Sequence, residues 1–480
     1  MCLNNTRQDR MQHFTPEEIQ LLHDASMKIL SEVGVEFNSA AAVTIFEKNG
    51  FKTDGKKVFF TENDVLKALE TTPSRFVVKS RNGDKNVTIG EQNYVLLPTG
   101  GASNVVTPTG EQRPTTFADY QTCCRLVQTS DQLDMTGFLM VQPNDLPPQT
   151  AHLDMVSANI TLCDKPYMSA TSTGETVVDS IEMAAIVWGG KEALHREPVM
   201  VAIANVMSPL QYSGEQAEVI MEMARYRQPV ILTTMVLAGS SGPISLPGVL
   251  ALQNAELLAG VVLTQLVGPG TPVVYSSTSA PMDMKAMTSA VGAPETAKLA
   301  SGTIQMARFY KLPCRTGGAL TDAHYPDAQA AVEGALTLST AVRNGANFIF
   351  HACGQMGGYI SMSFEKWLID EELCRILRNM LTPMTITPET IDVETIASIG
   401  PGGQYLTHPK TFQQFRNLSQ PVLFNRKDFG KWFDSGAERV DEVATKKLAE
   451  RLEGYSKPPI DTGLEEALDE YVQRRKALRS

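Results

Sequence analysis

Eight short apolar segments constrain the fold of this chain more than any other feature of its sequence. Most are rich in β-branched residues, and longer stretches of helical character separate them. The eight segments are Tyr94–Leu97, Met135–Val141, Tyr167–Thr171, Val199–Val206, Val230–Val236, Pro272–Ser277, Leu312–Thr316 and Asn347–His351. The helical stretches are Phe117–Gln128, Thr150–Leu162, Thr176–Trp188, Gly214–Tyr226, Leu250–Val267, Pro294–Tyr310, Ala328–Asn344 and Trp367–Met380. Eight strand–helix units favour an α/β fold, a TIM (β/α)8 barrel. An open, doubly wound sheet also fits, because the alternation counts units and does not show closure.

The barrel leaves an extension at each end of the 480-residue chain. The expected parts are an N-terminal helical and β-hairpin cap (1–90), the barrel (91–380) and a C-terminal helical extension (381–480). Thr15-Pro16-Glu17-Glu18 is a helix start, with a hydroxyl side chain, a proline and two acids in the first turn. Asn82-Gly83 is a turn signal between two β-rich runs. The charged amphipathic stretches near 441–452 and 464–478 are expected to cover the barrel or to contact another subunit, so we expect a homo-oligomer.

Charge and cysteine usage indicate where such a chain works. A formal net charge of −11 disfavours binding to nucleic acid or to an anionic membrane. Seven cysteines, without a CxxC pair, argue against a disulfide framework and favour a reducing cytoplasm. Residues 1–14 contain no apolar stretch of the signal-peptide type. The longest apolar run, near 257–267, is about half a membrane span. We therefore expect a cytoplasmic protein without an anchor.

Polar and aromatic residues gather at the predicted carboxyl ends of the strands, where a TIM barrel has its active site. They include Asn205, Tyr275, the run from Arg315 through Asp322, His324 and Tyr325 to Asp327, and the run from His351 through Gly357-Gly358-Tyr359. The sequence contains no HExxH, no zinc-spaced cluster of Cys and His, no GxSxG and no P-loop lysine motif. No bound metal or nucleotide and no catalytic residue acting by acid–base chemistry are predicted.

Several stretches resemble the trimethylamine methyltransferase superfamily. The resemblance rests on RTGGALTDAHYPDAQAAVE (Arg315–Glu333), Gln253-Asn254-Ala255-Glu256 with the following LLAGVVLTQLVGPG, Asp283-Met284, Ala293-Pro294-Glu295, FIFHACG, the run Asp370–Cys374 and IGPGGQYLTHPKTFQQFR. These matches occur in the expected order from about residue 15 to residue 470. The fold of that family is a TIM barrel, which agrees with the independent strand count. The resemblance implies transfer of a methyl group from a small methylated amine to cobalamin, a corrinoid carried by a partner corrinoid-binding protein.

One departure from the family bears on the substrate. The founding branch acts on trimethylamine and carries pyrrolysine just after a Thr-Asp pair, whereas this chain has ordinary residues throughout that loop, including His324 and Tyr325. The departure implies the branch without pyrrolysine, which demethylates quaternary amines such as glycine betaine, proline betaine and carnitine. A quaternary ammonium leaves as a neutral tertiary amine, so displacement by Co(I) needs no general acid. The protein then has to position the substrate, exclude water and admit the corrinoid face.

A carboxylated quaternary amine calls for two kinds of side chain. Aromatic faces hold the ammonium, at roughly 0.5–2 kcal/mol each, and hydrogen-bond donors hold the carboxylate. The candidate aromatic walls are Tyr275, Tyr325, Tyr359 and Phe364, and the candidate donors are His324, His351 and Arg315. Asp322, Asp327 and Glu256 are candidates for orienting the donors or assisting the cation, and Asn205 is a further substrate-binding candidate.

Several candidates also have a structural interpretation. Tyr275 lies within a strand and fits the core, and His351 follows three apolar residues and fits a buried, hydrogen-bonded histidine. Asp327 fits a helix cap. Glu256 interrupts an apolar helix, where a buried acid is costly unless paired, so it is either functional or part of the barrel framework.

Three other functions stay open at this level. The first is a methyltransferase for a tertiary or secondary methylamine, whose turnover would depend steeply on pH. The second is a non-catalytic barrel that binds betaines and never methylates cob(I)alamin. The third is a metal-dependent TIM-barrel hydrolase, against which the missing His/Asp cluster counts.

Overall fold

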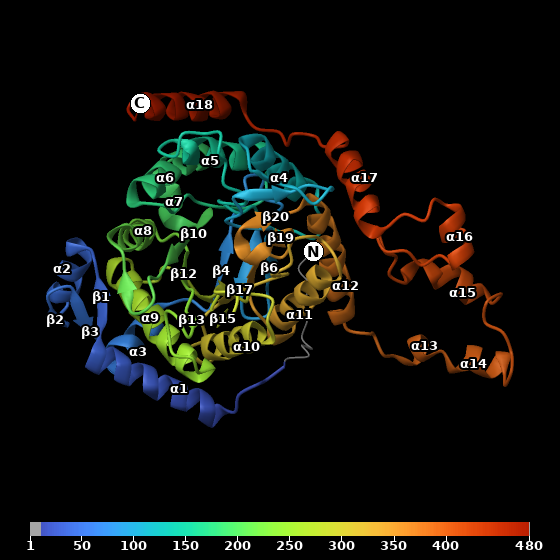
Figure 1. The fold of residues 1–480 in the computed structure, drawn as a ribbon, viewed down its shortest axis with the longest axis horizontal. Coiled ribbons are helices and arrows are strands. Elements are labelled where there is room, and N and C mark those ends of the chain that lie inside the picture. The colour runs from blue at the N-terminus through green and yellow to red at the C-terminus, as the bar shows by residue number, and fades with distance from the viewer. Residues whose placement is uncertain (1–10, 480) are drawn as a thin grey trace.

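The computed structural model describes residues 11–479, and a curled parallel sheet lies at its centre (Figure 1). In spatial order the strands are β6 (Val95–Leu96), β18 (Phe348–Phe350), β17 (Cys314–Gly317), β14 (Val273–Ser277), β12 (Val230–Thr234), β10 (Met200–Asn205) and β9 (Tyr167–Met168). All neighbouring pairs are parallel, and each strand from β9 to β18 pairs with the next in this series. Because β18 then pairs with β6, the first strand of the series, the sheet curls back towards its start.

The second predicted strand, Met135–Val141, is the exception. Thr136 forms an isolated parallel bridge with Tyr167, and the Asp134 N–H donates to the Leu96 carbonyl at 2.9 Å. The Asp134 carboxylate in turn accepts from the Leu96 N–H at 2.8 Å, in place of a backbone ladder partner. Gly137 lies so close to Phe350 that a Cβ there would be 3.3 Å from its ring. The prediction of a regular strand here is wrong, because backbone hydrogen bonds at Asp134 and Thr136 connect the segment to β6 and β9 without forming a continuous ladder.

Helices cover the outside of the sheet, as the sequence predicts. They are α4 (Phe117–Thr129), α5 (Ala151–Leu162), α6 (Gly174–Trp188), α7 (Lys191–Arg196), α8 (Gly214–Arg225), α9 (Leu246–Val267), α10 (Pro294–Phe309), α11 (Ala328–Asn344) and α12 (Phe364–Leu381). By length and composition α9 could cross a membrane, but 83% of its most apolar window is buried inside the fold. It packs between the strands β12 and β14 and the N-terminal helices, so it serves as a core helix.

The N-terminal extension wraps around α9 (Figure 1). Its elements are α1 (Pro16–Lys28), a π-helical turn (Ile29–Val33), β1 (Val35–Phe37), α2 (Ala40–Lys48), β2 (Lys52–Asp54), β3 (Lys57–Phe59), α3 (Glu62–Thr71), β4 (Arg75–Val78) and β5 (Val87–Gly90). The predicted helix start is confirmed, since Thr15 and Glu18 form a capping box. The predicted hairpin is confirmed as well, since β4 and β5 pair antiparallel.

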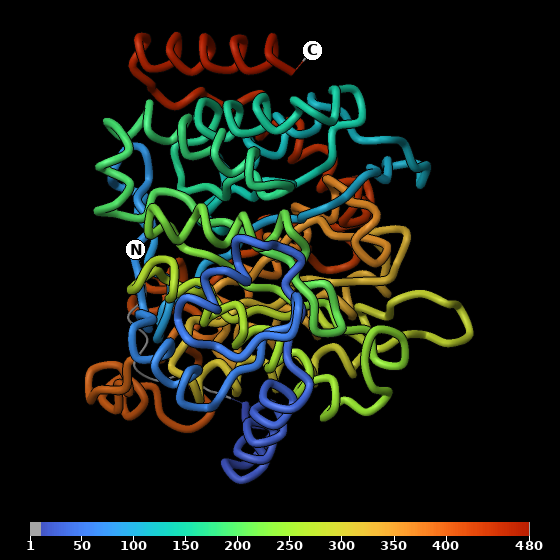
Figure 2. Tube along the Cα trace, turned by 90° about the vertical axis from the view of Figure 1, so that its left-hand side faces the viewer, coloured from blue at the N-terminus to red at the C-terminus, as the bar shows by residue number. Residues whose placement is uncertain are grey.

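Short strands lie at the carboxyl ends of the strands of the central sheet. They are β7 (Asn104–Val106), β8 (Gln112–Pro114), β11 (Gln211–Tyr212), β13 (Leu237–Ala238), β15 (Ala280–Asp283), β16 (Thr288–Ser289), β19 (Gln355–Met356) and β20 (Ser361–Met362). Four of them form a small sheet in the order β19-β20-β7-β8, and β19 and β20 lie near the middle of the view in Figure 1. The β15–β16 hairpin projects to the right in Figure 2, so this side is the mouth of the curled sheet.

The C-terminal extension has two contrasting parts. The helices α17 (Val440–Glu453) and α18 (Thr462–Ala477) pack on the chain's own α4, α5, α6 and α12. Between α12 and α17, residues 382–439 project from the body and are called the arm here (Figure 1). The arm contains α13 (Pro388–Ile391), α14 (Val393–Ile399), α15 (Pro409–Gln414), a 3-10 turn (Phe415–Asn417) and α16 (Phe429–Asp434).

Candidate active site

Strand register places one row of polar side chains across the inner face of the sheet. Asn205 pairs with Thr233, Thr233 with Ser276, and Ser276 with Arg315. Residues paired across parallel strands share a face, so these four lie in one layer at the carboxyl ends of β10, β12, β14 and β17. The hydroxyl of Thr233 donates to that of Ser276 at 2.8 Å. Asn205 is exposed and Arg315 is buried, so the layer runs from an open side to a covered side.

Arg315 is a buried cation without an acidic partner. Its side chain is 1% exposed, and Nη1 and Nη2 lie 3.5 Å from Ser276 Oγ and 3.3 Å from His351 Nδ1. The guanidinium also lies 5.2 Å from the centre of the Phe350 ring, and its Nε has no partner. Among residues 11–479 no carboxylate forms an ion pair with it. Burial lowers the pKa of Arg315 from 12.5 to about 10, so the group stays charged at neutral pH and is poorly compensated.

His351 points into the same layer because the chain turns at this residue. Its φ of 62° ends the alternation of β18, so the Phe350 and His351 rings stack at 4.3 Å instead of facing opposite sides. Burial, and then the positive charge of Arg315, hold the pKa of His351 well below its usual range. The imidazole is therefore neutral. It accepts from Arg315 through Nδ1, which leaves Nε2 as its N–H donor.

Tyr359 packs against His351 and covers this group. It lies in the turn between β19 and β20, after Gly357 and Gly358, and all three residues have positive φ. Its ring lies 5.0 Å from that of His351. Burial raises the pKa of Tyr359 to about 12, and its hydroxyl is buried without a hydrogen-bond partner. The structure thus brings Arg315, His351 and Tyr359 together, and both Arg315 Nε and the Tyr359 hydroxyl lack a hydrogen-bond partner.

Asp322 forms hydrogen bonds that hold the loops around this group and forms none with the three residues of the group. Its two carboxylate oxygens accept from the N–H groups of Val291 and Gly292 at 3.0 and 2.9 Å. The backbone just before it, at Thr321, accepts from the Gly358 N–H at 3.1 Å. Burial raises the pKa of Asp322 above its usual value. Asp322 therefore connects the loop after β17 with the loop that follows β16 and with the Tyr359 turn.

Glu256 has a comparable role on the other side of the mouth. Its carboxylate accepts from Ser208 Oγ at 2.9 Å and from the Leu210 N–H at 2.8 Å, so α9 holds the loop that follows Asn205. The residue is fully buried, and burial raises its pKa to about 7. The structural interpretation of Glu256 fits this geometry, because both hydrogen bonds go to the framework of the loop.

Several other candidates lie outside the Arg315 group. Tyr275 faces the helices and donates to Asn254 Oδ1 at 2.9 Å, because it is one residue out of phase with Ser276. Tyr325 points away and donates to Pro108 O and Asp441 Oδ2, each at 3.2 Å.

His324, Phe364 and Asp327 also stay apart from the group. His324 is exposed and lies against Gly357. Phe364 starts α12 and packs against the main core. Asp327 caps α11 by accepting from the N–H groups of Gln329 and Ala330.

Sequence reasoning missed Thr233, Ser276 and Phe350 as members of the site. The hydroxyls of Thr233 and Ser276 and the Phe350 ring line the inner layer around Arg315. A signal existed for Ser276, since polar residues at the end of an otherwise apolar strand are unusual in a buried parallel sheet. Phe350 had no such signal, because an aromatic residue in an apolar run is ordinary core.

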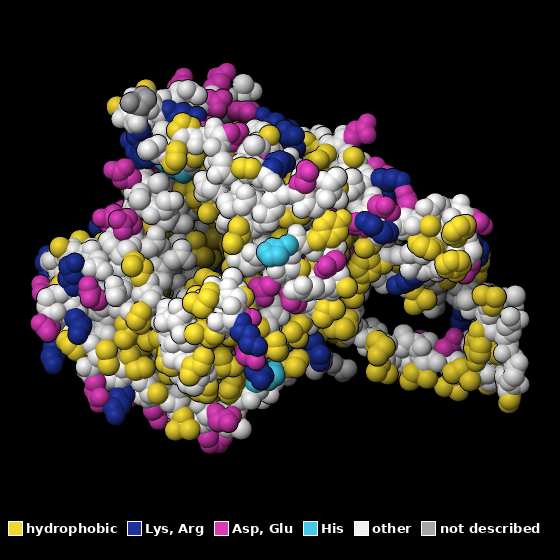
Figure 3. Space-filling view, viewed as in Figure 1, with side chains coloured by type: hydrophobic (Ala, Val, Ile, Leu, Met, Phe, Trp, Pro, Cys, Tyr) yellow, Lys and Arg dark blue, Asp and Glu magenta, His cyan; other side chains and the backbone are white. Residues whose placement is uncertain are grey.

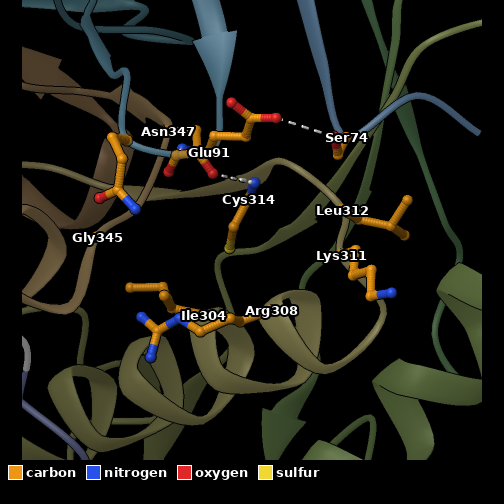
Figure 4. Close-up of a pocket in the computed structure, with 10 residues that line it drawn as sticks. Ser74, Glu91, Ile304, Arg308, Lys311, Leu312, Cys314, Gly345 and Asn347 are labelled. Carbon is orange, nitrogen blue, oxygen red and sulfur yellow. Dashed lines mark hydrogen bonds between the residues drawn. The ribbon is translucent and has the colours of Figure 1, made fainter. Parts of the chain in front are cut away.

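No group of three or more metal-ligating side chains occurs among residues 11–479. A pocket of about 320 Å³ lies at the opposite, amino end of the strands, between the β4–β5 hairpin and the starts of β17 and β18 (Figure 4). There Asn347 accepts from the Cys314 N–H at 3.0 Å and donates to the Glu91 carbonyl at 3.1 Å. These contacts fasten the N-terminal cap to the base of the sheet.

Comparison with known proteins places the chain in a family. The family model for trimethylamine methyltransferase (MTTB) matches residues 3–479. A glycine betaine methyltransferase of Desulfitobacterium hafniense (strain Y51) is 36% identical over 462 residues, which cover 96% of each chain. A proline betaine:corrinoid methyltransferase of Eubacterium limosum is 30% identical over 475 residues, covering 96% of this chain and 97% of the other. The chain therefore belongs to the trimethylamine methyltransferase family, as the sequence resemblance implies.

A solved structure supports the fold. The monomethylamine methyltransferase MtmB of Methanosarcina barkeri superposes with a TM-score of 0.50 over 95% of this chain and 90% of that chain, at 12% sequence identity. At this identity the likeness concerns the fold alone.

Proposed function

We propose that this protein transfers a methyl group from a carboxylated quaternary amine of the betaine class to the corrinoid of a partner protein. The membership of the family and the two betaine methyltransferases among its relatives support the reaction class. The corrinoid supplies the reduced cobalt that accepts the methyl group. Everything this chain contributes is then binding, orientation and exclusion of water.

The uncompensated guanidinium of Arg315 is the observation that carries the substrate class. A buried cation costs free energy unless an anion accompanies it. A carboxylate bound beside Arg315 would supply that anion, and a fork-shaped guanidinium suits a planar carboxylate. The free hydroxyl of Tyr359 is a further donor at the same place. A small amine without a carboxylate, such as trimethylamine, would leave both Arg315 and Tyr359 without that partner.

The ammonium end of the substrate would then face the open side of the layer. The rings of Phe350 and Tyr359 stand beside Arg315, and their faces suit a quaternary cation. From there the inner layer leads through Ser276 and Thr233 to the exposed Asn205. The three successive positive-φ residues before β20 form the turn that covers Arg315, so this turn is the segment that has to admit the substrate.

An apolar rim around the mouth suits a protein partner that carries the corrinoid. The large apolar side chains exposed on loops at the carboxyl ends of the strands are Met207, Met235, Ile244, Met284, Met287 and Ile360. Methionine side chains adapt to partners and are common on such surfaces. We place the corrinoid-binding protein on this rim. We also propose that the segment 134–136 completes an eight-unit TIM barrel between β6 and β9, and that the protein works in the cytoplasm.

An anaerobic assay with free cob(I)alamin, or with a cognate corrinoid protein, tests this function. Glycine betaine and other betaines should give methylcobalamin, read from the absorbance change, whereas trimethylamine at equal concentration should not. Methyl transfer from trimethylamine but not from betaines would refute the assignment of the substrate class. Betaine binding without methyl transfer, with both acceptors supplied, would refute the assignment as an enzyme.

A further inference from the structure

The arm exposes more apolar surface than any other part of the described chain. Its exposed large apolar side chains are Met384, Ile386, Ile391, Val393, Ile396, Tyr405, Leu406, Phe412, Phe415, Leu418, Val422, Phe424, Phe429 and Phe433. Phe412 is 78% exposed, Phe429 75% and Leu406 74%. Single exposed apolar residues are ordinary, but a contiguous set of this size marks an interaction surface.

The first part of the arm, residues 382–425, has the composition of a permanently covered interface. These 44 residues include only five charged ones, in a chain with 20% charged residues, whereas the last 14 residues of the arm, 426–439, include seven. Two of these five charges neutralise each other, since Lys410 pairs with Asp392 at 2.7 Å. Depletion of charge together with enrichment in aromatic residues and methionine is typical of the buried centre of an interface, and obligate interfaces are the most apolar.

Both ends of the arm are fastened to the body, so the arm is a closed loop and not a free tail. The helices at its two ends, α12 and α17, pack against each other. Near its return, the N–H groups of Val422 and Leu423 donate to Glu372 at 2.9 and 3.2 Å. Between these anchors the space-filling view shows an opening that passes between the arm and the body (Figure 3). No side chain of residues 11–479 fills this space in that view.

We propose that a second copy of this chain covers the arm, with the two arms packed against each other around a two-fold axis. The area is sufficient. Fourteen large apolar side chains that are mostly more than half exposed offer on the order of 1,000 Å², and a stable interface needs about 800 Å² per partner. A two-fold contact uses the same patch on both copies, so one apolar surface per chain is all that the assembly requires.

The position of the arm favours a second copy over the corrinoid-binding partner. In Figure 2 the first part of the arm, with α13 and α14 in orange, lies at the lower left, whereas the β15–β16 hairpin at the mouth projects to the right. A protein that delivers a corrinoid has to reach the mouth and leave again after each turnover, so it cannot cover an apolar surface at the other end permanently. A second copy of the chain is always present and does not need to leave.

The two predicted interaction helices are then not the contact. Their apolar residues, among them Ala444 and Leu468, are buried against the chain's own helices. The arm provides the surface instead. This inference concerns assembly and does not rest on the proposed reaction.

Light scattering coupled to size exclusion, with the full chain at micromolar concentration, tests the proposal. The wild type should have a mass of twice 52.4 kDa or a higher multiple of it. The double variant Leu406→Glu, Phe412→Glu should be monomeric, because two buried carboxylates in each arm would face the same residues of the other copy. Both side chains are exposed within the single chain, so the variant should keep the wild-type circular dichroism spectrum and melting behaviour of the barrel.

Val332→Glu is the matched control. Val332 lies on α11 and is 68% exposed, comparable to the arm residues, but it lies outside the arm. The control should keep the wild-type mass. A monomeric wild type would overturn the proposal. So would an arm variant that folds and keeps the wild-type mass, or an assembly that Val332→Glu dissolves and the arm variant does not.

Discussion

Arg315→Met separates a substrate-binding role of the buried cation from a structural one. The substitution removes the charge and keeps an unbranched side chain in the layer of Ser276 and His351. If a carboxylate binds here, truncating one partner of a buried charge pair costs about 2–5 kcal/mol, or roughly 30- to 4,000-fold in kcat/KM for glycine betaine. Tetramethylammonium has the same cationic head and no carboxylate, so its kcat/KM should change far less.

The effect on stability should have the opposite sign to that of an ordinary core truncation. The pKa of Arg315 is lowered from 12.5 to about 10, which corresponds to roughly 3 kcal/mol of unfavourable burial at 1.36 kcal/mol per pKa unit. Loss of the contact with Phe350 offsets roughly 0.5–2 kcal/mol of this. The free energy of unfolding of Arg315→Met should therefore be higher by about 1–2.5 kcal/mol, whereas a core truncation lowers it by about 2–5 kcal/mol.

Two measurements on the same preparation distinguish a substrate-binding role of Arg315 from a structural one. Initial rates of methylcobalamin formation with glycine betaine and with tetramethylammonium give the ratio of their kcat/KM values, and urea denaturation gives the stability. The ratio should be high for the wild type and close to one for Arg315→Met. A variant that loses stability and loses both substrates in parallel would refute the reasoning, because Arg315 would then be a structural cation. Retained preference for glycine betaine would refute it as well.

Three further outcomes follow from other buried groups. Burial raises the pKa of Glu256 from the ordinary value of 4.5 to about 7 in the folded protein. This carboxyl therefore favours the folded state below pH 4.5, and its contribution falls by roughly 3 kcal/mol as the pH rises to above 7. Glu256→Gln should abolish that part of the slope when urea denaturation is compared at pH 5 and pH 8, and an unchanged slope would contradict it. Asp370→Asn removes the carboxylate that lies 2.6 Å from the buried ammonium of Lys366, so it should lower the free energy of unfolding by about 3–5 kcal/mol. A loss below about 1 kcal/mol in urea denaturation would show that water solvates the ammonium in the variant. Gly100→Ala would place a Cβ 2.4 Å from Phe350 Cζ, so it should displace that ring and lower kcat/KM for glycine betaine; wild-type rates would show that the ring is not part of the substrate wall.

The candidate site shows where sequence reasoning holds and where it stops. Arg315, His351 and Tyr359 were all expected at the mouth, since each lies near or beyond the carboxyl end of a predicted strand, and the structure brings them together. Tyr275 was expected there as well but faces the helices. Both faces of a buried parallel strand are apolar, so the sequence shows a strand without showing which residues point inward. Tyr325 depends on Asp441, 116 residues further along the chain, and no local pattern reports such a contact.

The sequence by itself determined the local elements and the family. Helix caps such as Thr15 and Asp327, the β4–β5 turn and the alternation of strands and helices depend on hydrogen bonds and periodicities within a few residues. The tertiary structure alone decided that Arg315 has no acidic partner, that the second predicted strand forms isolated backbone contacts and no continuous ladder, and that the arm is exposed. These properties depend on which distant groups exclude water from each other, and desolvation is set by the packing of the whole chain rather than by neighbours in sequence.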